Sequence, residues 1–232
     1  MSANLMNLAR SGGKFLKLFG DRKMMKLLPY DAEVEWLQAV RGNYINTGIV
    51  LGNNRTFRIS ATAMTKGLIE SEMPIASCWT SETAWFNLFF GGSAGALSLS
   101  MYAGQDIGHL RPRTQILANT MYHISCGMDA EGLYGLKGRR FIETDSSGFT
   151  TTVNLATYPY NGQEVLILAR GDRNNEYSAY VQSVKLEIGS DVVFDGIAVR
   201  KDDVGYFYDR VSGQLFGNQG TDAFIIGPDK TI

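Results

Sequence analysis

Apolar and polar residues alternate with a period of two along most of the chain after its first 28 residues. The segment FRISATAM (57–64) is the clearest case, since every odd-numbered position is apolar and Arg, Ser and Thr lie between them. The same alternation occurs in 32–40, 96–104 and 179–188, and 164–170 is an apolar run bounded by charged residues. Each pattern predicts a strand, with one face buried in the alternating segments and both faces buried in the continuous run.

Glycine-containing pairs separate the predicted strands. Gly91-Gly92, Asn161-Gly162 and Ser212-Gly213 are turn signals, and the chain holds 26 glycines against 5 prolines. With 232 residues, 44% of them hydrophobic and 19% charged, the chain is able to bury a core as one domain. The pattern therefore predicts an all-β fold, an antiparallel β-sandwich, over residues 29–232.

Residues 1–28 have a helical period instead. Apolar side chains fall on one side of a helical wheel and basic side chains on the other, although Gly12 and Gly13 interrupt the pattern at about 1 kcal/mol each. Six basic residues and one acidic residue give this segment a charge of +5, so that the net charge of −1 leaves −6 for the rest. We expect this basic arm to attach the body to a larger assembly. The residues assigned to attachment are Leu5, Leu8, Arg10, Lys14, Leu16, Lys17 and Phe19.

Other interpretations of the arm compete with docking onto a protein. A secretory signal peptide is disfavoured, because lysines interrupt the apolar residues and no small-residue cleavage site follows. A helix lying on a membrane surface fits the basic polar face. Nucleic acid is disfavoured, because aromatic residues in the arm are limited to Phe15 and Phe19. No apolar run in the chain approaches the length of a transmembrane helix.

Three segments of the body carry a resemblance to a known family. EVEWLQAVRGNYINTGI (33–49) is similar to a first strand followed by a Gly-containing turn and a Tyr-Ile-(Asn/Asp)-Thr-Gly strand. MYHISCGMDAEGLYGLKGRRF (121–141) looks like a strand and hairpin, and VLILARGD (165–172) looks like a Leu-Gly-Ala-Arg strand. Together they resemble concanavalin A-like lectin/glucanase domains of the laminin-G-like jelly-roll kind. The resemblance covers residues 30–228 and implies a jelly-roll β-sandwich, a fold that hosts many unrelated functions.

The most specific match is FDGIAVRKDDVGYFYDRVSGQLFGNQGTDAFIIGP (194–228). It resembles a C-terminal signature of proteins from gut bacteriophages and Bacteroides-type bacteria, although Ala198 replaces the usual Pro. The resemblance implies a non-enzymatic virion protein: a capsid decoration, head fibre or tail-associated adhesion protein. We expect it to assemble in the bacterial host cytoplasm, to form a homo-oligomer, and to bind other virion proteins through residues 1–28. The alternative is a bacterial carbohydrate-binding module, secreted or at the cell surface.

Catalytic patterns are missing from the sequence. The glucanase relatives cleave sugars with carboxylates arranged as Glu-x-Asp-x-x-Glu, and this string does not occur. The nearest pairs, Glu70 with Glu72 and Glu143 with Asp145, lie beside loop-like residues. The segment GGSAG (91–95) shares a spacing with serine hydrolases but lies in a strand-to-strand turn. We therefore expect no enzymatic activity, and a glycoside hydrolase is the weakest alternative.

An aromatic stretch, CWTSETAWFNLFF (78–90), is the main candidate for a binding surface. Both faces of its second half are apolar, which favours a central strand covered on both sides or a subunit contact. The functional alternative is a platform on which sugar rings stack beside a hydrogen-bonding amide. The predicted glycan-binding residues are Trp79, Trp85, Asn87 and Tyr102.

Metal ligands are sparse in the sequence. The two histidines, His109 and His123, have no second ligand at metal-binding spacing. The resemblance leaves a Ca²⁺ ion at the sandwich rim open, through loop oxygens. Because acidic loop residues are usually just solvated, we expect no cofactor. The candidate Ca²⁺ ligands are Asp172, Asn174, Asp202 and Asp203.

The two cysteines, Cys78 and Cys126, lie in strand-like contexts far apart in the sequence. A disulfide framework needs more of them, and a free cysteine behaves as a small buried hydrophobe. We expect both thiols to be free and the compartment of folding to be reducing.

Overall fold

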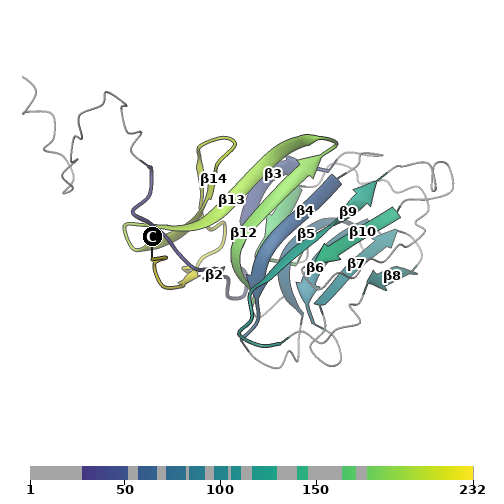
Figure 1. Cartoon of the computed structure of the whole chain (residues 1–232), viewed down its shortest axis with the longest axis horizontal. Helices are drawn as coiled ribbons and strands as arrows, with labels where there is room; N and C mark the ends of the chain where they lie inside the picture. Colours follow the sequence, from purple (N-terminus) through teal and green to yellow (C-terminus); the bar gives the residue numbers. More distant parts are fainter. Residues whose placement is uncertain are drawn as a thin grey trace, which may run out of the picture.

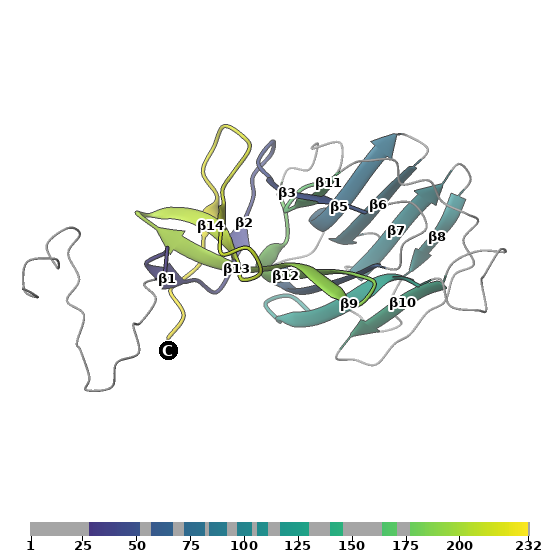
Figure 2. The ribbon, with the colours of Figure 1, turned by 90° about the horizontal axis from the view of Figure 1, so that it is seen from above.

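Two antiparallel sheets stacked face to face form the part of the chain described by the computed structural model (Figures 1 and 2). The predicted all-β sandwich is therefore confirmed. Within the described ranges no helix is long and apolar enough to cross a membrane. The described residues are 28–51, 57–66, 72–81, 84–91, 97–103, 106–110, 117–129, 140–145, 164–170 and 177–231.

The first sheet has ten strands in these ranges, and seven of them follow the order β10-β9-β4-β12-β13-β14-β15. Three short strands join it at one end: β1 pairs with β13, and β2 pairs with β12 and β16. Its strands are β1 (Ala32–Glu33), β2 (Leu37–Gln38), β4 (Phe57–Met64), β9 (Tyr122–Asp129), β10 (Arg140–Asp145), β12 (Tyr180–Ile188), β13 (Asp191–Lys201), β14 (Val204–Asp209), β15 (Leu215–Phe216) and β16 (Ile225–Ile226).

The second sheet follows the order β3-β11-β5-β6-β7-β8. It places β6, the aromatic strand, in the interior of the sheet, as its two apolar faces predicted. Its strands are β3 (Ile45–Val50), β5 (Met73–Ser81), β6 (Ala84–Phe90), β7 (Leu97–Ala103), β8 (Asp106–Leu110) and β11 (Glu164–Ile167).

The core lies between the sheets and follows the predicted alternation. On β4, Phe57, Ile59, Ala61 and Ala63 are all at most 4% exposed and belong to one core cluster. From the opposite sheet, side chains such as that of Phe90 reach the same cluster. Burial of one large apolar side chain contributes about 1.5–3 kcal/mol, so this cluster is the main source of stability.

The predicted strand over 32–40 is wrong in one respect. The chain forms two two-residue strands there, because β1 pairs with β13 while β2 pairs with β12 and β16. Trp36 lies between them at 7% exposure and packs against Gly227, where an added Cβ would come within 2.8 Å of the indole ring. Alternate burial holds for Val34, Glu35 and Trp36, but Leu37, Gln38 and Ala39 are all buried, because the chain changes its pairing partner there.

The uncharged stretch YINTGI (44–49) forms most of β3, the outer strand of the second sheet, and its pairing with β11 is irregular. Between Asn46 and Val50, β3 has two more residues than its partner β11, so the ladder contains a bulge. Gly48 has φ +69°, and the Thr47 hydroxyl donates to the Val165 carbonyl at 2.8 Å in place of a ladder bond. A bulged edge strand is a poor template for pairing with another chain.

The C-terminal signature forms the predicted hairpin. Phe207 pairs with Phe216 across β14 and β15, and Gly213 in the turn has φ +74°. Asp209, at the end of β14, lies on the same face as the buried Phe207 and is only 2% exposed although it carries a carboxyl group. Its carboxylate accepts bonds from the backbone N–H groups of Asp195, Val211 and Ser212 and from the Ser212 hydroxyl, at 2.6–3.1 Å.

These bonds decide the charge state of Asp209. Burial alone raises the pKa of its carboxyl, and the bonds from the Ser212 hydroxyl and the three N–H groups outweigh that effect and hold the pKa below its usual value. Asp209 therefore ties the β14–β15 turn to the neighbouring strand as a carboxylate.

The predicted attachment arm lies outside the described residues, with its members Leu5, Leu8, Arg10, Lys14, Leu16, Lys17 and Phe19. The division of the chain into residues 1–28 and 29–232 stays a prediction. The first described residues and the C-terminus lie at one end of the sandwich, and β7 and β8 lie at the other (Figures 1 and 2).

Candidate functional site

The backbone register aligns the predicted glycan-binding positions in one row across three strands. Trp79 on β5 pairs with Trp85 on β6, and Trp85 pairs with Tyr102 on β7. Asn87 lies two positions along β6 and pairs with Ser77 and Ser100. Because residues two apart in a strand share a face, these positions belong to one face of the second sheet. Whether they bind sugar stays a prediction.

Asn87 has an unusual environment for a polar side chain. It is 2% exposed, and its Nδ2 donates to Glu72 Oε2 at 3.4 Å. The same Glu72 oxygen accepts a bond from Arg170 Nη1 at 3.1 Å. The Oδ1 atom of Asn87 has no hydrogen-bond partner within the described structure. A buried acceptor without a partner costs about 1–3 kcal/mol.

Burial on both faces of β6 confirms the expected covered strand over its described side chains. Leu88 and Phe90 belong to the core cluster, and Asn87 and Phe89, on the opposite face, are also buried at 2% and 3% exposure. Ser77 is fully buried beside them and donates to the Ala169 carbonyl at 2.8 Å. The segment after β11 therefore contributes to this side of the sheet.

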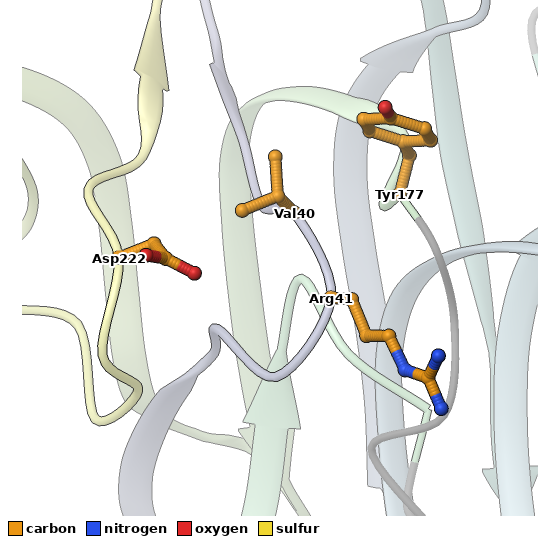
Figure 3. A pocket seen from close by; sticks show the side chains of 4 residues that line it. All are labelled: Val40, Arg41, Tyr177 and Asp222. Atoms are coloured by element: carbon orange, nitrogen blue, oxygen red, sulfur yellow. The ribbon is translucent and has the colours of Figure 1, made fainter.

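A second place with exposed functional groups is a hollow of about 380 Å³ beside the turn after β2. It is lined by Val40, Arg41, Tyr177 and Asp222 (Figure 3). Tyr177 is 50% exposed, and Arg41 and Asp222 are exposed as well. Sequence reasoning missed this hollow, because its residues come from three distant segments without a shared motif.

A network of asparagine bonds holds one wall of the hollow. Asn43 is 1% exposed, and its Oδ1 accepts bonds from Asn218 Nδ2 at 3.0 Å and from the Asp222 N–H at 3.1 Å. Asn218 Oδ1 accepts bonds from the Tyr44 N–H at 3.1 Å and the Gly220 N–H at 2.9 Å, and its Nδ2 also donates to the Asp222 carbonyl. The C-terminal loop is thereby locked to the turn between β2 and β3.

Glycine is required where the two segments meet. An added Cβ at Gly220 would lie 2.3 Å from both Asn43 Oδ1 and the Gly42 carbonyl, a distance at which the backbone must shift. Gly42 has φ +81°, a conformation that other residues rarely adopt. The glycines of this contact allow the close approach that forms the network.

Two of the four candidate Ca²⁺ ligands, Asp202 and Asp203, lie in the described part of the chain. No group of three His, Cys, Asp or Glu side chains there is arranged to hold an ion. Asp202 and Asp203 form the two-residue turn between β13 and β14, with φ of +49° and +62°, and Arg200 contacts Asp203 at 3.4 Å. The other two candidates, Asp172 and Asn174, lie outside the described residues.

His123 and Cys78 are the histidine and the cysteine whose side chains the structure describes. Nδ1 of His123 lies 2.8 Å from the Thr62 hydroxyl, so this ring has a hydrogen-bonding role. Cys78 is free and fully buried, and burial raises the pKa of its thiol to about 12. This confirms the small buried hydrophobe predicted for Cys78. The backbone of Cys126 lies on β9, opposite Ile59 of β4.

Comparison with protein families finds no model that matches, and no curated protein matches either. Among solved structures, the chain is similar to a native heptameric SAP-like pentraxin from Limulus polyphemus, with a TM-score of 0.53 and 11% identity. That match covers 86% of this chain and 98% of the pentraxin.

A protein from Bacteroides ovatus ATCC 8483, described as a "putative carbohydrate binding protein", matches with a TM-score of 0.54 and 12% identity. It is covered over 61% of its length by 86% of this chain, so the chain spans only part of that protein. At such identities the likeness establishes the fold alone. The chain has a two-sheet β-sandwich fold like that of the pentraxin, which agrees with the concanavalin A-like fold that the sequence resemblance implied.

Proposed function

We propose that this protein is a non-enzymatic, lectin-like module that binds carbohydrate on the face of the second sheet formed by β5, β6 and β7. The observation that carries this proposal is the register that aligns Trp79, Trp85 and Tyr102 beside the buried amide of Asn87. The description of the Bacteroides ovatus protein, which shares the fold, supports the same function.

The chemistry of this face matches what a sugar presents. A pyranose has an apolar face of C–H groups, which packs on aromatic rings, and a rim of hydroxyl groups, which hydrogen-bond to amides and carboxylates. Glu72 and Arg170 are partly exposed charged groups at this face, and Glu72 links them to the buried Asn87 amide, whose Oδ1 has no partner of its own. Small-molecule sites commonly combine an apolar surface with a few convergent polar groups in this way.

Binding is favoured over hydrolysis because Glu72, a carboxylate in this cluster, already accepts hydrogen bonds from two other side chains. Cleavage of a glycosidic bond needs two carboxyl groups about 5–10 Å apart across the bond. Glu72 forms an ion pair with Arg170 and accepts a hydrogen bond from Asn87, so its carboxylate holds this cluster together. Incubation with a panel of polysaccharides should therefore release no new reducing ends.

The test is a glycan array probed with the full chain and with variants. Trp85→Ala should lose at least about tenfold in affinity for any bound glycan, because loss of the apolar contact of one large side chain costs about 1.5–3 kcal/mol. Trp85→Phe keeps a ring and should retain most of the binding, while Tyr177→Ala on the distant hollow should leave it unchanged. Binding that survives Trp85→Ala in a folded variant contradicts this assignment of the site.

A second proposal concerns where the module works. We propose that it is displayed on a bacteriophage particle, as a capsid decoration, head fibre or tail-associated protein. It would assemble in the host cytoplasm and be anchored by residues 1–28; a bacterial cell surface is the alternative. The arm and body have opposite charges of +5 and −6, and the C-terminal stretch resembles proteins of gut bacteriophages. The body begins at the end opposite β7 and β8, which suits attachment at one end and recognition at the other (Figure 1).

Deletion of residues 2–28 tests the anchoring. The shortened chain should fold cooperatively and no longer co-purify with particles, because burial of the arm's leucines and Phe19 would supply about 1.5–3 kcal/mol each. Incorporation at full occupancy without the arm would place the attachment in the sandwich. The Limulus pentraxin is heptameric, and we propose that this chain also forms a homo-oligomer; sedimentation of the full chain as a monomer would contradict that.

A further inference from the structure

The hollow beside the β2–β3 turn has rigid walls made by distant parts of the chain. Val40 and Tyr177 form an antiparallel β-bridge, and the Ser178 N–H donates to the Ala39 carbonyl at 2.9 Å. The Asn43 N–H donates to the Val40 carbonyl at 3.0 Å, which closes the turn that carries Arg41. A wall fixed in this way loses little conformational entropy when a ligand binds.

Asp222 on the third wall is fixed equally well. Its N–H donates to the buried Asn43 amide oxygen, and its carbonyl accepts a bond from Asn218. The backbone on each side of the hollow is therefore held by hydrogen bonds, while the side chains that line it project from these fixed points.

The functional groups at the end of these side chains are free. Within the described residues, the Arg41 guanidinium, the Asp222 carboxylate and the Tyr177 hydroxyl make no hydrogen bond or ion pair with one another or with other groups. Figure 3 shows Asp222 on one side of Val40, with Arg41 and Tyr177 on the other. A cation, an anion and a half-exposed aromatic ring thus share one hollow without neutralising each other.

We infer that this hollow is a binding site for an acidic sugar residue, a hexuronate, separate from the aromatic face of the second sheet. The inference rests on the proposed glycan-binding function and deepens it by naming a charged sugar. An arginine fork pairs with a carboxylate through two parallel bonds. The carboxylate of Asp222 accepts bonds from sugar hydroxyl groups, and the Tyr177 ring and Val40 contact the C–H groups of the pyranose.

Other ligands fit this set of groups less well. A phosphate or sulfate polyanion would gain from Arg41, but it brings more negative charge near Asp222 than the single carboxylate of a hexuronate does, so its net attraction is smaller. A neutral sugar offers Arg41 hydroxyl groups but no carboxylate, so the charged pair does not form. A free amino acid without a ring, such as glycine, carries both charges but offers no surface for Tyr177, and its binding is an outcome of the test.

The test is a titration of the full chain, followed by ligand-observed NMR, with methyl β-D-glucuronide and the neutral methyl β-D-glucoside. The glucuronide should bind at least about tenfold more tightly than the glucoside, because a hydrogen bond between charged groups is worth more than one between neutral groups. Its affinity should fall as salt is raised from 0.01 to 1 M, as expected for a pair of exposed charges. Glycine serves as the amino-acid probe and should not compete with the glucuronide.

Variants locate the site. Arg41→Gln and Tyr177→Ala should each weaken glucuronide binding at least about tenfold, whereas Arg58→Gln, an exposed arginine on β4, should leave it unchanged. Thermal unfolding checks that each variant is folded. Equal affinity for the two glycosides, competition by glycine, or full binding in Arg41→Gln would each overturn the inference.

The experiments can contradict the proposal for the hollow and the proposal for the aromatic face independently. Loss of glucuronide binding in Trp85→Ala but not in Arg41→Gln would leave the proposed function standing and move the acidic sugar to the aromatic face. An array that shows neutral glycans on the aromatic face, without any glucuronide binding, would overturn the hollow alone. Failure of every sugar on the array would overturn the proposed function itself.

Discussion

Replacement of Asn218 by alanine tests how the C-terminal loop is held to the rest of the sandwich. The side chain makes four hydrogen bonds: it accepts from Tyr44 and Gly220 and donates to Asn43 and Asp222. A buried hydrogen bond contributes about 0.5–1.5 kcal/mol, and water replaces some of the lost partners at this half-buried position. The free energy of unfolding should therefore fall by about 2–4 kcal/mol.

The assay is urea unfolding followed by tryptophan fluorescence, for which the buried Trp36 near the C-terminal strands is a natural reporter. Gln219→Ala is the matched control, because the neighbouring residue contacts the body through its backbone N–H, at 2.9 Å from the Tyr44 carbonyl. That variant should stay within about 0.5 kcal/mol of the wild type. If Asn218→Ala is as stable as Gln219→Ala, the asparagine network does not hold the loop. Loss of the network should also weaken glucuronide binding, because Asp222 would no longer be held in place.

Three further substitutions or modifications test separate parts of the account. Asp209→Asn should lower the free energy of unfolding at pH 7 by about 2 kcal/mol, measured by urea titration. Because the folded pKa of Asp209 lies below its unfolded value, this contribution should be present above about pH 4 and disappear as the pH falls through the folded pKa; a difference that persists below pH 2 would contradict it. The Cys78 thiol, with a pKa of about 12, should resist a disulfide reagent at pH 8 in a folded Cys126→Ser variant and react in denaturant; rapid reaction in the folded state would show that it is accessible. Gly220→Ala should destabilise the protein by at least about 2 kcal/mol in thermal or urea unfolding, because the added methyl group meets the backbone; a stability equal to the wild type would refute the close contact.

Local pattern predicted the regular strands well, because the burial of alternate side chains is what the pattern encodes. The segment 57–64 is β4 as expected, and 179–188 contains β12. The prediction for 32–40 failed because its pairing partners change between Glu33 and Leu37. The pairing depends on segments about 170–190 residues away, which alternation does not specify.

One of the two candidate sites could be predicted from the sequence, and the other could not. The aromatic stretch on β6 could be found in the sequence because its residues are neighbours, and the register then places Trp79 and Tyr102 on either side of Trp85. The hollow could not be found, because Asp222 and the turn that it contacts are 179 residues apart. Asn218 was part of the matched C-terminal signature, but the sequence gives no indication that its partner is Asn43.

The central claim is that the β5–β6–β7 face binds carbohydrate. The most direct test is a glycan array that measures binding by the wild type and by Trp85→Ala. The account predicts that the full chain binds at least one class of glycan. Trp85→Ala, shown to be folded by its thermal unfolding curve, should bind that glycan at least about tenfold more weakly. Retention of the same glycans at the same strength by Trp85→Ala, or no glycan retained by the wild type, would contradict the claim.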